Sequence, residues 1–486
     1  ADKDSDWVYI ESGDVRGFVE QKYLDFSDET KKQIEANGED KYQTAKEKHT
    51  ENYTIVYADA DKTYVALDFV EKYTNIKYKM YKDPNRITVT KTWGTIEQSS
   101  VKKDAELRVK GGIKSPILRT VKKDETVTVV ESGEKWIKVC TKDGYIGYVK
   151  NRQLDKAEKK ELKSDFKEPE ITHNLKKEKI NMAWHQVTEQ AANSTLANVL
   201  SATKGVNVIA PTWFYLNDNN GGIKTLASSD YVTYAHQNGL EVWGLVDNFK
   251  EGVSTYETLS RTSSRQRLVN QLTAAAIQYG LDGINVDFET ITTECSRAYI
   301  EFIRELSIMC RINGIVLSVD NYVPTSSSDH YDRAEQGVVA DYVIMMGYDE
   351  HFAGGEAGSV SSINYVKNGI AGMLENVPRE KLIGGVPFYT RLWTEAGDGT
   401  ITSKAMGIAE EKRWVDNNQV ELTWQADTAQ YYGEVQTSDG AQFLWMEEER
   451  SLKEKMNVIR QNDLAGVACW KLGFEDSAAW DSIQWN

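Results

Sequence analysis

Residues 281–289 read LDGINVDFE, a run in which apolar and polar side chains alternate from Ile284 to Glu289. Side chains alternate between the two faces of a β-strand, so Asn285, Asp287 and Glu289 share one face and the apolar residues between them share the other. Polar groups directed into a core cost several kcal/mol unless they have partners. The alternative is an exposed strand with solvated carboxylates, but the flanking residues are continuously apolar. The pattern therefore predicts a buried strand that ends in a polar site.

Strand-like apolar runs alternate with amphipathic helical stretches from residue 179 onward. Eight such strands alternating with helices predict an α/β fold, a (β/α)8 TIM barrel, whose catalytic residues lie at the C-terminal ends of the strands. Glu289 would then lie at the mouth and Asp287 one layer deeper, about 7 Å along the strand. Residues 421–447 are too strand-like for a simple helix and are expected to form a small α+β insertion between the last two barrel strands. The expected strands are Ile180–Trp184, Val206–Pro211, Glu241–Val246, Gly283–Phe288, Val316–Val319, Tyr342–Met346, Leu382–Val386 and Val467–Trp470.

Two similar segments precede the barrel and each predicts a β-hairpin. Residues 6–19 read DWVYIESGDVRGFV and residues 135–149 read KWIKVCTKDGYIGYV, with a Gly-bearing turn between alternating apolar runs. Strand-like runs precede the second copy, at Ile117–Thr120 and Glu125–Val130, but not the first. Both segments resemble bacterial SH3-type wall-binding domains. We therefore expect an incomplete module at residues 1–28 and a complete one at residues 96–155.

The remaining N-terminal segments are expected to be a small module and a linker. Residues 29–95 contain an expected helix, Leu67–Tyr73, followed by strand-like runs around Asp83–Arg86. This stretch resembles the α+β stalk module named after the N-terminus of amine oxidases. It has no His cluster, so we expect no metal there. Residues 156–178 are dense in Lys and Glu and are expected to be a solvated linker before the barrel domain of residues 179–486.

The composition of the 486 residues excludes several classes of protein. With 40% hydrophobic and 27% charged residues the chain is globular, and no apolar run reaches about 18 residues, so no membrane span is expected. The net charge of -16 argues against nucleic acid as the main partner. Residues 1–180 hold 36 Lys and Arg against 34 Asp and Glu, whereas the remainder holds 22 against 40. Four scattered Cys exclude a disulfide scaffold, and six scattered His predict neither metal nor cofactor.

The barrel segment resembles family 18 glycoside hydrolases in an ordered set of motifs. DGINVDFE at residues 282–289 resembles the family signature DGxDxDxE, with Asn285 in place of the usual middle Asp. VIMMGYD at residues 343–349 resembles the sixth-strand M-x-Y-D element, and GVPFYTRLW at residues 385–393 resembles the seventh-strand segment of chitinases. Trp470 ends the expected eighth strand, where the family has a Trp beneath the sugar. The Asn form of the motif, followed by Phe-Glu, resembles the spore-cortex and wall-lytic N-acetylglucosaminidases.

The resemblance implies a substrate-assisted retaining mechanism, in which the 2-acetamido oxygen of the sugar attacks the anomeric carbon. Glu289 would protonate the leaving oxygen and later deprotonate the incoming water. Asp287 would orient the acetamido group, and Tyr348 would hydrogen-bond its carbonyl oxygen. Asp349 would hold a hydroxyl group or tune Tyr348, although it could equally cap a following helix. Trp470 would stack on the apolar face of the sugar, or pack in the core.

Other side chains at expected strand ends are candidates for substrate binding. Asn285 is expected to hold Asp287 and to keep its carboxylate ionised, because an amide cannot compete for a proton. Aromatic side chains at a barrel mouth line a sugar cleft about as often as they pack under a loop, and both readings stay open. The candidates are Asn285, Asp349, Trp470, Tyr389, Arg391, Trp213 and Trp184, together with Tyr215 and Trp243.

Three functions are compatible with these residues. The first is a secreted hydrolase that cleaves β-1,4 bonds after N-acetylglucosamine in bacterial peptidoglycan, held at the cell wall or spore by its N-terminal modules. The second is a chitinase or chitooligosaccharide hydrolase, and the third is a catalytically silent sugar-binding barrel. The joint presence of Glu289, Asp287 and Tyr348 favours an enzyme, and the wall-type modules favour peptidoglycan. The chain is expected to be an extracellular monomer, with any export signal encoded upstream of Ala1.

Overall fold

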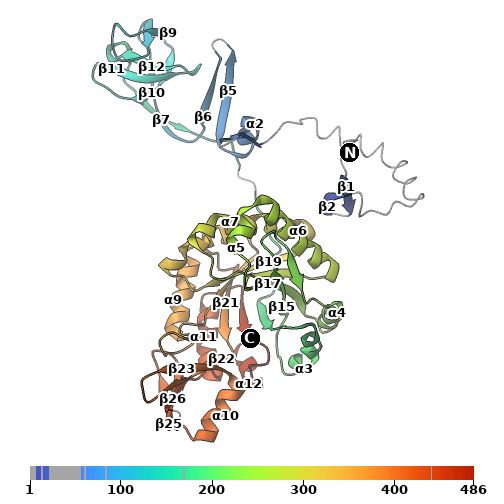
Figure 1. Cartoon of the computed structure of the whole chain (residues 1–486). Helices are drawn as coiled ribbons and strands as arrows, with labels where there is room; N and C mark the ends of the chain where they lie inside the picture. Colours follow the sequence, from blue (N-terminus) through green and yellow to red (C-terminus); the bar gives the residue numbers. More distant parts are fainter. Residues whose placement is uncertain are drawn as a thin grey trace, which may run out of the picture. The chain divides into compact units, whose positions relative to one another are not determined.

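The computed structural model falls into two compact units, one that contains the barrel segment from residue 171 onward and one that ends at residue 170 (Figure 1). Among the residues that the structure describes, no helix is long and apolar enough to cross a membrane. The described residues are 7–12, 15–20, 56–59, 62–82, 85–167, 170–438 and 440–485.

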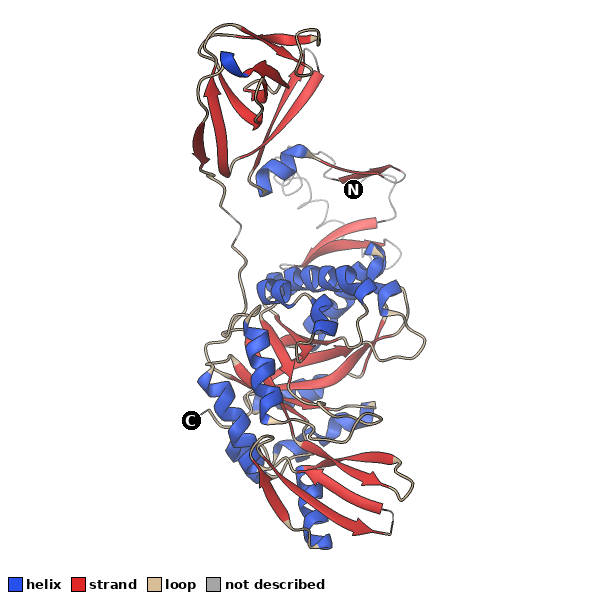
Figure 2. Cartoon of the chain, turned by 90° about the vertical axis from the view of Figure 1, so that its left-hand side faces the viewer, coloured by secondary structure: helices blue, strands red, loops and turns tan. Residues whose placement is uncertain are grey.

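Eight parallel strands close into a barrel, as expected, with the last strand paired to the first and helices covering the outside (Figure 2). Each expected barrel strand is present, with ends that differ by a few residues. The barrel strands are β14 (Ile180–His185), β15 (Val208–Leu216), β17 (Glu241–Asp247), β18 (Gly283–Asp287), β19 (Val316–Tyr322), β20 (Tyr342–Met346), β21 (Leu382–Pro387) and β27 (Gly466–Trp470). The helices are α3 (Leu196–Leu200), α4 (Ser229–Gln237), α5 (Thr255–Ser260), α6 (Thr262–Tyr279), α7 (Ser296–Asn313), α8 (Arg333–Val339), α9 (Ile363–Leu374), α11 (Glu449–Gln461) and α12 (Ser477–Ser482). A short strand, β16 (Ile223–Thr225), pairs antiparallel with β15.

Two apolar layers hold the barrel together. Side chains on one face of the strands pack against the helices, and those on the other face fill the interior, where Trp184, Trp243 and Tyr342 are buried. Because both faces of each strand are covered, these strands are largely apolar runs. The long helices α6 and α7 each end at a left-handed glycine, Gly280 and Gly314, which turns the chain into the next strand.

The insertion between β21 and β27 is larger than the expected residues 421–447. It is a five-stranded antiparallel sheet with one helix, and it begins at Tyr389, directly after the seventh barrel strand. The run GVPFYTRLW looks like one strand, but the chain divides at Phe388, whose N–H donates to Trp470 in the last barrel strand. Tyr389 and Arg391 therefore belong to the insertion sheet. Its elements are β22 (Tyr389–Glu395), β23 (Ile401–Gly407), α10 (Ile408–Asn418), β24 (Leu422–Gln425), β25 (Gln430–Thr437) and β26 (Gly440–Trp445) (Figure 1).

The second unit contains a seven-stranded sheet around a small apolar core. The expected strands and hairpin of residues 117–149 are present within it. The expected linker of residues 156–178 is wrong for its first part, because residues 158–162 form β13 and pair with β7. Their Lys and Glu side chains are exposed while the backbone completes the ladder, so charge density alone misled the prediction. The strands are β7 (Gly94–Ser100), β8 (Ala105–Arg108), β9 (Ile117–Val121), β10 (Thr126–Glu131), β11 (Trp136–Thr141), β12 (Ile146–Lys150) and β13 (Glu158–Leu162).

The described segments before β7 form a helix and short hairpins. The helix expected at Leu67–Tyr73 is present as α2. The hairpin expected at the N-terminus is present as β1 (Trp7–Ser12) and β2 (Val15–Glu20), while the rest of the module expected at residues 1–28 lies outside the described residues. The other hairpins are β3 (Val56–Asp59) with β4 (Lys62–Val65) and β5 (Ile76–Lys82) with β6 (Asn85–Lys91).

The first prediction concerns Gly283, which leaves room for an indole ring in the barrel interior. A Cβ atom at Gly283 would lie 2.6 Å from Cδ1 of Trp243, whose ring stacks on Tyr342 at 5.6 Å between centroids. Gly283→Ala should therefore lower the free energy of unfolding by about 1–3 kcal/mol, measured by urea denaturation. Gly397→Ala is the control, because a Cβ atom there would meet nothing within 4 Å. Equal stability of both variants would contradict the tight fit.

Candidate active site

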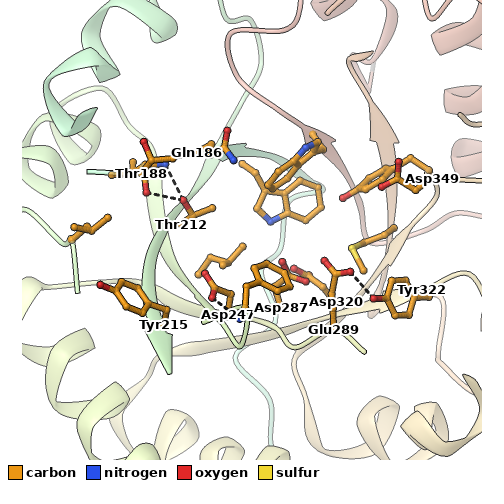
Figure 3. A pocket seen from close by; sticks show the side chains of 18 residues that line it. Gln186, Thr188, Thr212, Tyr215, Asp247, Asp287, Glu289, Asp320, Tyr322 and Asp349 are labelled. Carbon is orange, nitrogen blue, oxygen red and sulfur yellow. Dashed lines mark hydrogen bonds between the residues drawn. The ribbon is translucent and has the colours of Figure 1, made fainter. Parts of the chain in front are cut away.

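A pocket of about 430 Å³ opens where the barrel strands end, and we refer to it as the mouth pocket. Figure 3 shows carboxyl groups from three strands and the segment after β18 gathered in its middle, with Tyr215 on one side and Asp349 on the other. The sequence-predicted residues that line it are Glu289, Asp287, Tyr348, Asp349, Trp470 and Trp184, together with Tyr215.

Glu289 lies just beyond β18 and is held from two sides. The Tyr322 hydroxyl donates to its Oε2 atom at 2.5 Å (Figure 3). The Asn248 side chain accepts from its backbone N–H and donates to its backbone carbonyl oxygen. Burial raises the pKa of the Glu289 carboxyl above its usual value; the Tyr322 hydrogen bond opposes the rise, and the nearby Asp349 adds to it. A carboxyl group that keeps its proton at higher pH is suited to act as a general acid.

Asp287 and Asp320 form a buried carboxyl pair deeper in the mouth pocket. Asp320 on β19 follows the registered pair Val286–Val319 and so lies beside Asp287, the last residue of β18. Burial raises the pKa of Asp287 well above its usual value, and the charge of Asp320 adds to the rise. Burial also raises the pKa of Asp320. Two buried carboxyl groups that lie side by side do not both ionise readily.

Asn285 lies one layer deeper than Asp287, but its partners are not the expected ones. Its amide nitrogen donates to Asp320 Oδ1 at 2.8 Å and to Ser318 Oγ at 3.0 Å, and its Oδ1 accepts from the Trp184 indole at 3.0 Å. The expectation that Asn285 holds Asp287 ionised is therefore wrong. The competing carboxyl group comes from the next strand, and the Oδ1 atom of Asp287 makes no hydrogen bond with any described residue.

The mouth pocket is bounded on its other side by aromatic rings. The rings of Trp184 and Trp470 lie 5.8 Å apart between centroids, and Tyr348 meets Trp184 edge-on at 6.4 Å. Asp349 accepts a hydrogen bond from the Tyr389 hydroxyl at 2.7 Å. The alternative in which Asp349 caps a helix is wrong, because the next helix starts at Ile363 and is capped by Ser362.

Five expected binding residues do not line the mouth pocket, and two of them are Asn285 and Tyr389. Trp213 is fully buried behind its wall and donates to Asn193, and Trp243 lies in the interior against Tyr342. Arg391 donates to Ser403 within the insertion sheet. The sequence does not reveal whether an aromatic side chain near a strand end points into the barrel or away from it. For this reason Trp213 and Trp243 were wrongly expected to line the pocket. Tyr389 contacts two residues that line the mouth pocket: its hydroxyl donates to Asp349, and its ring meets the Tyr348 ring edge-on at 6.3 Å between centroids.

Several residues of the mouth pocket escaped the sequence analysis. Asp247, at the end of β17, lies in register with Asp287, and burial raises the pKa of its carboxyl. Asp320 and Tyr322 belong to the run SVDNY at residues 318–322, where polar side chains alternate as they do in the LDGINVDFE stretch. The same period of two would have found them. The remaining polar residues that were missed are Gln186, Thr188 and Thr212.

The sequence of residues 242–475 matches the model of the glycosyl hydrolases family 18. The barrel domain belongs to glycosyl hydrolase family 18. In the second unit, residues 103–155 match the bacterial SH3 domain, which confirms the expected resemblance to that class of domain.

Relatives of the family 18 domain are found among bacterial glycosylases. Over 319 residues the chain is 27% identical to the uncharacterized glycosylase YvbX of Bacillus subtilis (strain 168), covering 61% of this chain and 92% of that protein. Over 230 residues it is 26% identical to the cortical fragment-lytic enzyme of the same organism, covering 46% of this chain and 53% of that enzyme. The crystal structure of a chitinase from Chromobacterium violaceum ATCC 12472 has the same fold, with a TM-score of 0.57, 20% identity and coverage of 63% of this chain and 98% of that one.

The second prediction concerns the Asn285 side chain of the family 18 domain. Asn285→Leu would leave the Trp184 indole and Asp320 without their buried partner. The free energy of unfolding should fall by about 1–3 kcal/mol for each polar group left unpaired, measured by denaturation. Asn418→Leu is the matched control, because Asn418 is exposed and bonds only within its own helix. A loss no larger than that of the control would show that Asn285 does not organise the mouth pocket.

Proposed function

We propose that the protein is a secreted N-acetylglucosaminidase that cleaves β-1,4 bonds after N-acetylglucosamine in bacterial peptidoglycan, with retention at the anomeric carbon. The observation that carries the proposal is the position of Glu289. It is a buried carboxyl group at the mouth pocket with a raised pKa, above a carboxyl pair that includes Asp287 and across from Tyr348. A proton donor, a carboxylate and a hydroxyl are the groups that the family mechanism requires around one sugar.

In the first step Glu289 donates its proton to the glycosidic oxygen while the acetamido carbonyl oxygen of the sugar attacks the anomeric carbon. The bond to the leaving sugar breaks, and a cyclic oxazolinium ion forms. The free Oδ1 atom of Asp287 is available to accept the acetamido N–H, and the negative charge of the Asp287–Asp320 pair stabilises the cation. Tyr348 donates to the acetamido oxygen and so holds it in line for attack.

In the second step water attacks the anomeric carbon and gives a proton to Glu289, which is now ionised. The ring of the oxazolinium opens, and the product keeps the configuration of the substrate. The Tyr322 hydroxyl, which donates to Oε2 of Glu289, stabilises the carboxylate in this half of the cycle. Trp470 and Trp184 offer apolar rings to the sugar, and no enzyme nucleophile is required.

Peptidoglycan is favoured over chitin by the rest of the chain. Residues 103–155 are a bacterial SH3 domain, which we take to hold the enzyme at a cell wall or spore. One relative is a cortical fragment-lytic enzyme, so a wall polymer is the substrate that the relatives suggest. Chitin remains the second candidate, since the same groups of the mouth pocket would bind a chitin sugar.

The third prediction tests the function with purified peptidoglycan and colloidal chitin, digested side by side and analysed by mass spectrometry of reducing ends. Peptidoglycan should yield N-acetylglucosamine ends, and NMR of early product should show the β-anomer first. Glu289→Gln should lower kcat by about 10²–10⁴-fold without weakening the binding of an N-acetylglucosamine oligomer. Glu395→Gln, at an exposed position of β22, is the control.

Each other outcome of this experiment points to a different function. Cleavage of chitin alone would identify a chitinase. Sugar binding without turnover of either polymer would identify a silent barrel. An early α-anomer would rule out the retaining mechanism.

The fourth prediction concerns the pH dependence of catalysis. The Tyr322 hydroxyl favours the ionised form of Glu289, so Tyr322→Phe should raise the pKa of that carboxyl further. Because the acid must be protonated to act, the descending alkaline limb of kcat/KM should move to higher pH, although kcat itself falls. Tyr431→Phe, in the insertion sheet, should leave the limb in place. A limb that stays fixed or moves to lower pH in Tyr322→Phe would show that Glu289 is not the titrating acid.

A further inference from the structure

The turn of residues 347–350, which carries Tyr348 and Asp349, has a backbone that needs support from outside. Asp349 has a φ angle of 59°, in the left-handed region that a residue with a Cβ atom adopts only at an energetic cost. Gly347 lies so close to β21 that an added Cβ atom would be 2.5 Å from the carbonyl oxygen of Gly385. A turn in this conformation persists only where its surroundings hold it.

The loop of residues 358–362 supplies that support from both ends of the turn. Ser361 Oγ donates to the carbonyl oxygen of Gly347 at 2.6 Å, directly before Tyr348. The Glu350 N–H donates to the carbonyl oxygen of Val360 at 3.0 Å, directly after Asp349. The Glu350 side chain in turn accepts from the N–H of Ser362 at 2.8 Å. The position of the turn therefore depends on the position of this loop.

The insertion sheet holds the same loop through two side chains. Trp393 on β22 donates from its indole to the carbonyl oxygen of Gly358 at 2.9 Å. Gln430 on β25 accepts a hydrogen bond from Ser359 Oγ, which also accepts from the N–H of Ser361. Both contacts are buried, and a path of three hydrogen bonds, from Gln430 through Ser359 and Ser361, joins the insertion to the backbone of the turn.

Gln430 is itself fixed to a buried ion pair. Its amide nitrogen donates to Glu447 Oε2 at 3.1 Å, and Glu447 pairs with Lys455 of α11 at 2.8 Å. Ser451 donates to the same carboxylate, and all of these side chains are buried. A glutamine amide has both a donor and an acceptor, so it can join an acceptor on one side to a donor on the other. Lys455 belongs to the barrel helix α11, so Gln430 is tied to the barrel as well as to the insertion.

We propose that Gln430 is a positioning residue, which holds Tyr348 in place for catalysis through Ser359, Ser361 and Gly347. The insertion domain thus contributes to catalysis through Gln430, although Gln430 does not contact the substrate. The kinetic part of this inference rests on the proposed function, because Tyr348 is taken to act on the acetamido group. The structural part, the support of the turn, stands on the contacts alone.

The fifth prediction tests this with Gln430→Met, which keeps the volume of the side chain and removes both hydrogen bonds. Hydrogen–deuterium exchange should become faster at the amides of Glu350, Ser361 and Ser362. The value of kcat on an N-acetylglucosamine oligomer should fall about 10–100-fold with KM little changed. In a Tyr348→Phe background the same substitution should cause little further loss. Gln442→Met is the matched control, since the hydrogen bonds of Gln442 stay within the insertion.

Ser359→Ala breaks the same hydrogen bond from the other side and serves if Gln430→Met does not fold. Unchanged exchange at the three amides in the folded variant overturns the proposal, and this measurement needs no substrate. If the wild-type protein cleaves no N-acetylglucosamine polymer, the proposed function fails while the exchange result still decides whether Gln430 supports the turn. Equal losses of kcat in the wild-type and Tyr348→Phe backgrounds would show a general structural effect and would also overturn the positioning role.

Discussion

Asp287 and Asp320 are buried side by side at the mouth of the barrel, where the ionisation of both would be costly. The neighbouring side chains supply hydrogen bonds that reduce this cost. Asn285 donates to Asp320 and leaves one oxygen of Asp287 free, while the same amide accepts from Trp184 and so sets that ring against Trp470. The arrangement of the mouth pocket thus depends on one buried pair of carboxyl groups and on the hydrogen bond that Asn285 donates to one of them.

The barrel and its central motif could be predicted from the sequence because their signals are local. Each strand is covered on both faces and is therefore a short apolar run, and the alternation in LDGINVDFE places Asp287 and Glu289 on one face without reference to any other strand. The resemblance of residues 343–349 added Tyr348, which indeed lines the mouth pocket.

The parts that could not be predicted depend on contacts between distant segments. The sequence around Asn285 does not show that its partner is Asp320, which comes from another strand. The alternation that marks Asp320 and Tyr322 is present in the run of residues 318–322, but this run ends in a tyrosine and not in a carboxylate, so by itself it does not indicate an acidic site. The start of the insertion at Tyr389 depends on a backbone bond from Phe388 to Trp470, which no local pattern records.

The last strand of the seven-stranded sheet, β13, affects how readily that sheet pairs with another molecule. β13 covers one side of β7, and it does so with a run of lysines and glutamates that point into solvent. A chain cut at residue 155, where the bacterial SH3 match ends, would keep the apolar core yet leave β7 with unpaired N–H and carbonyl groups. Such an open edge is a template for the strand of another molecule. With β13 present the edge strand is β13 itself, and its exposed lysines and glutamates disfavour pairing with another chain.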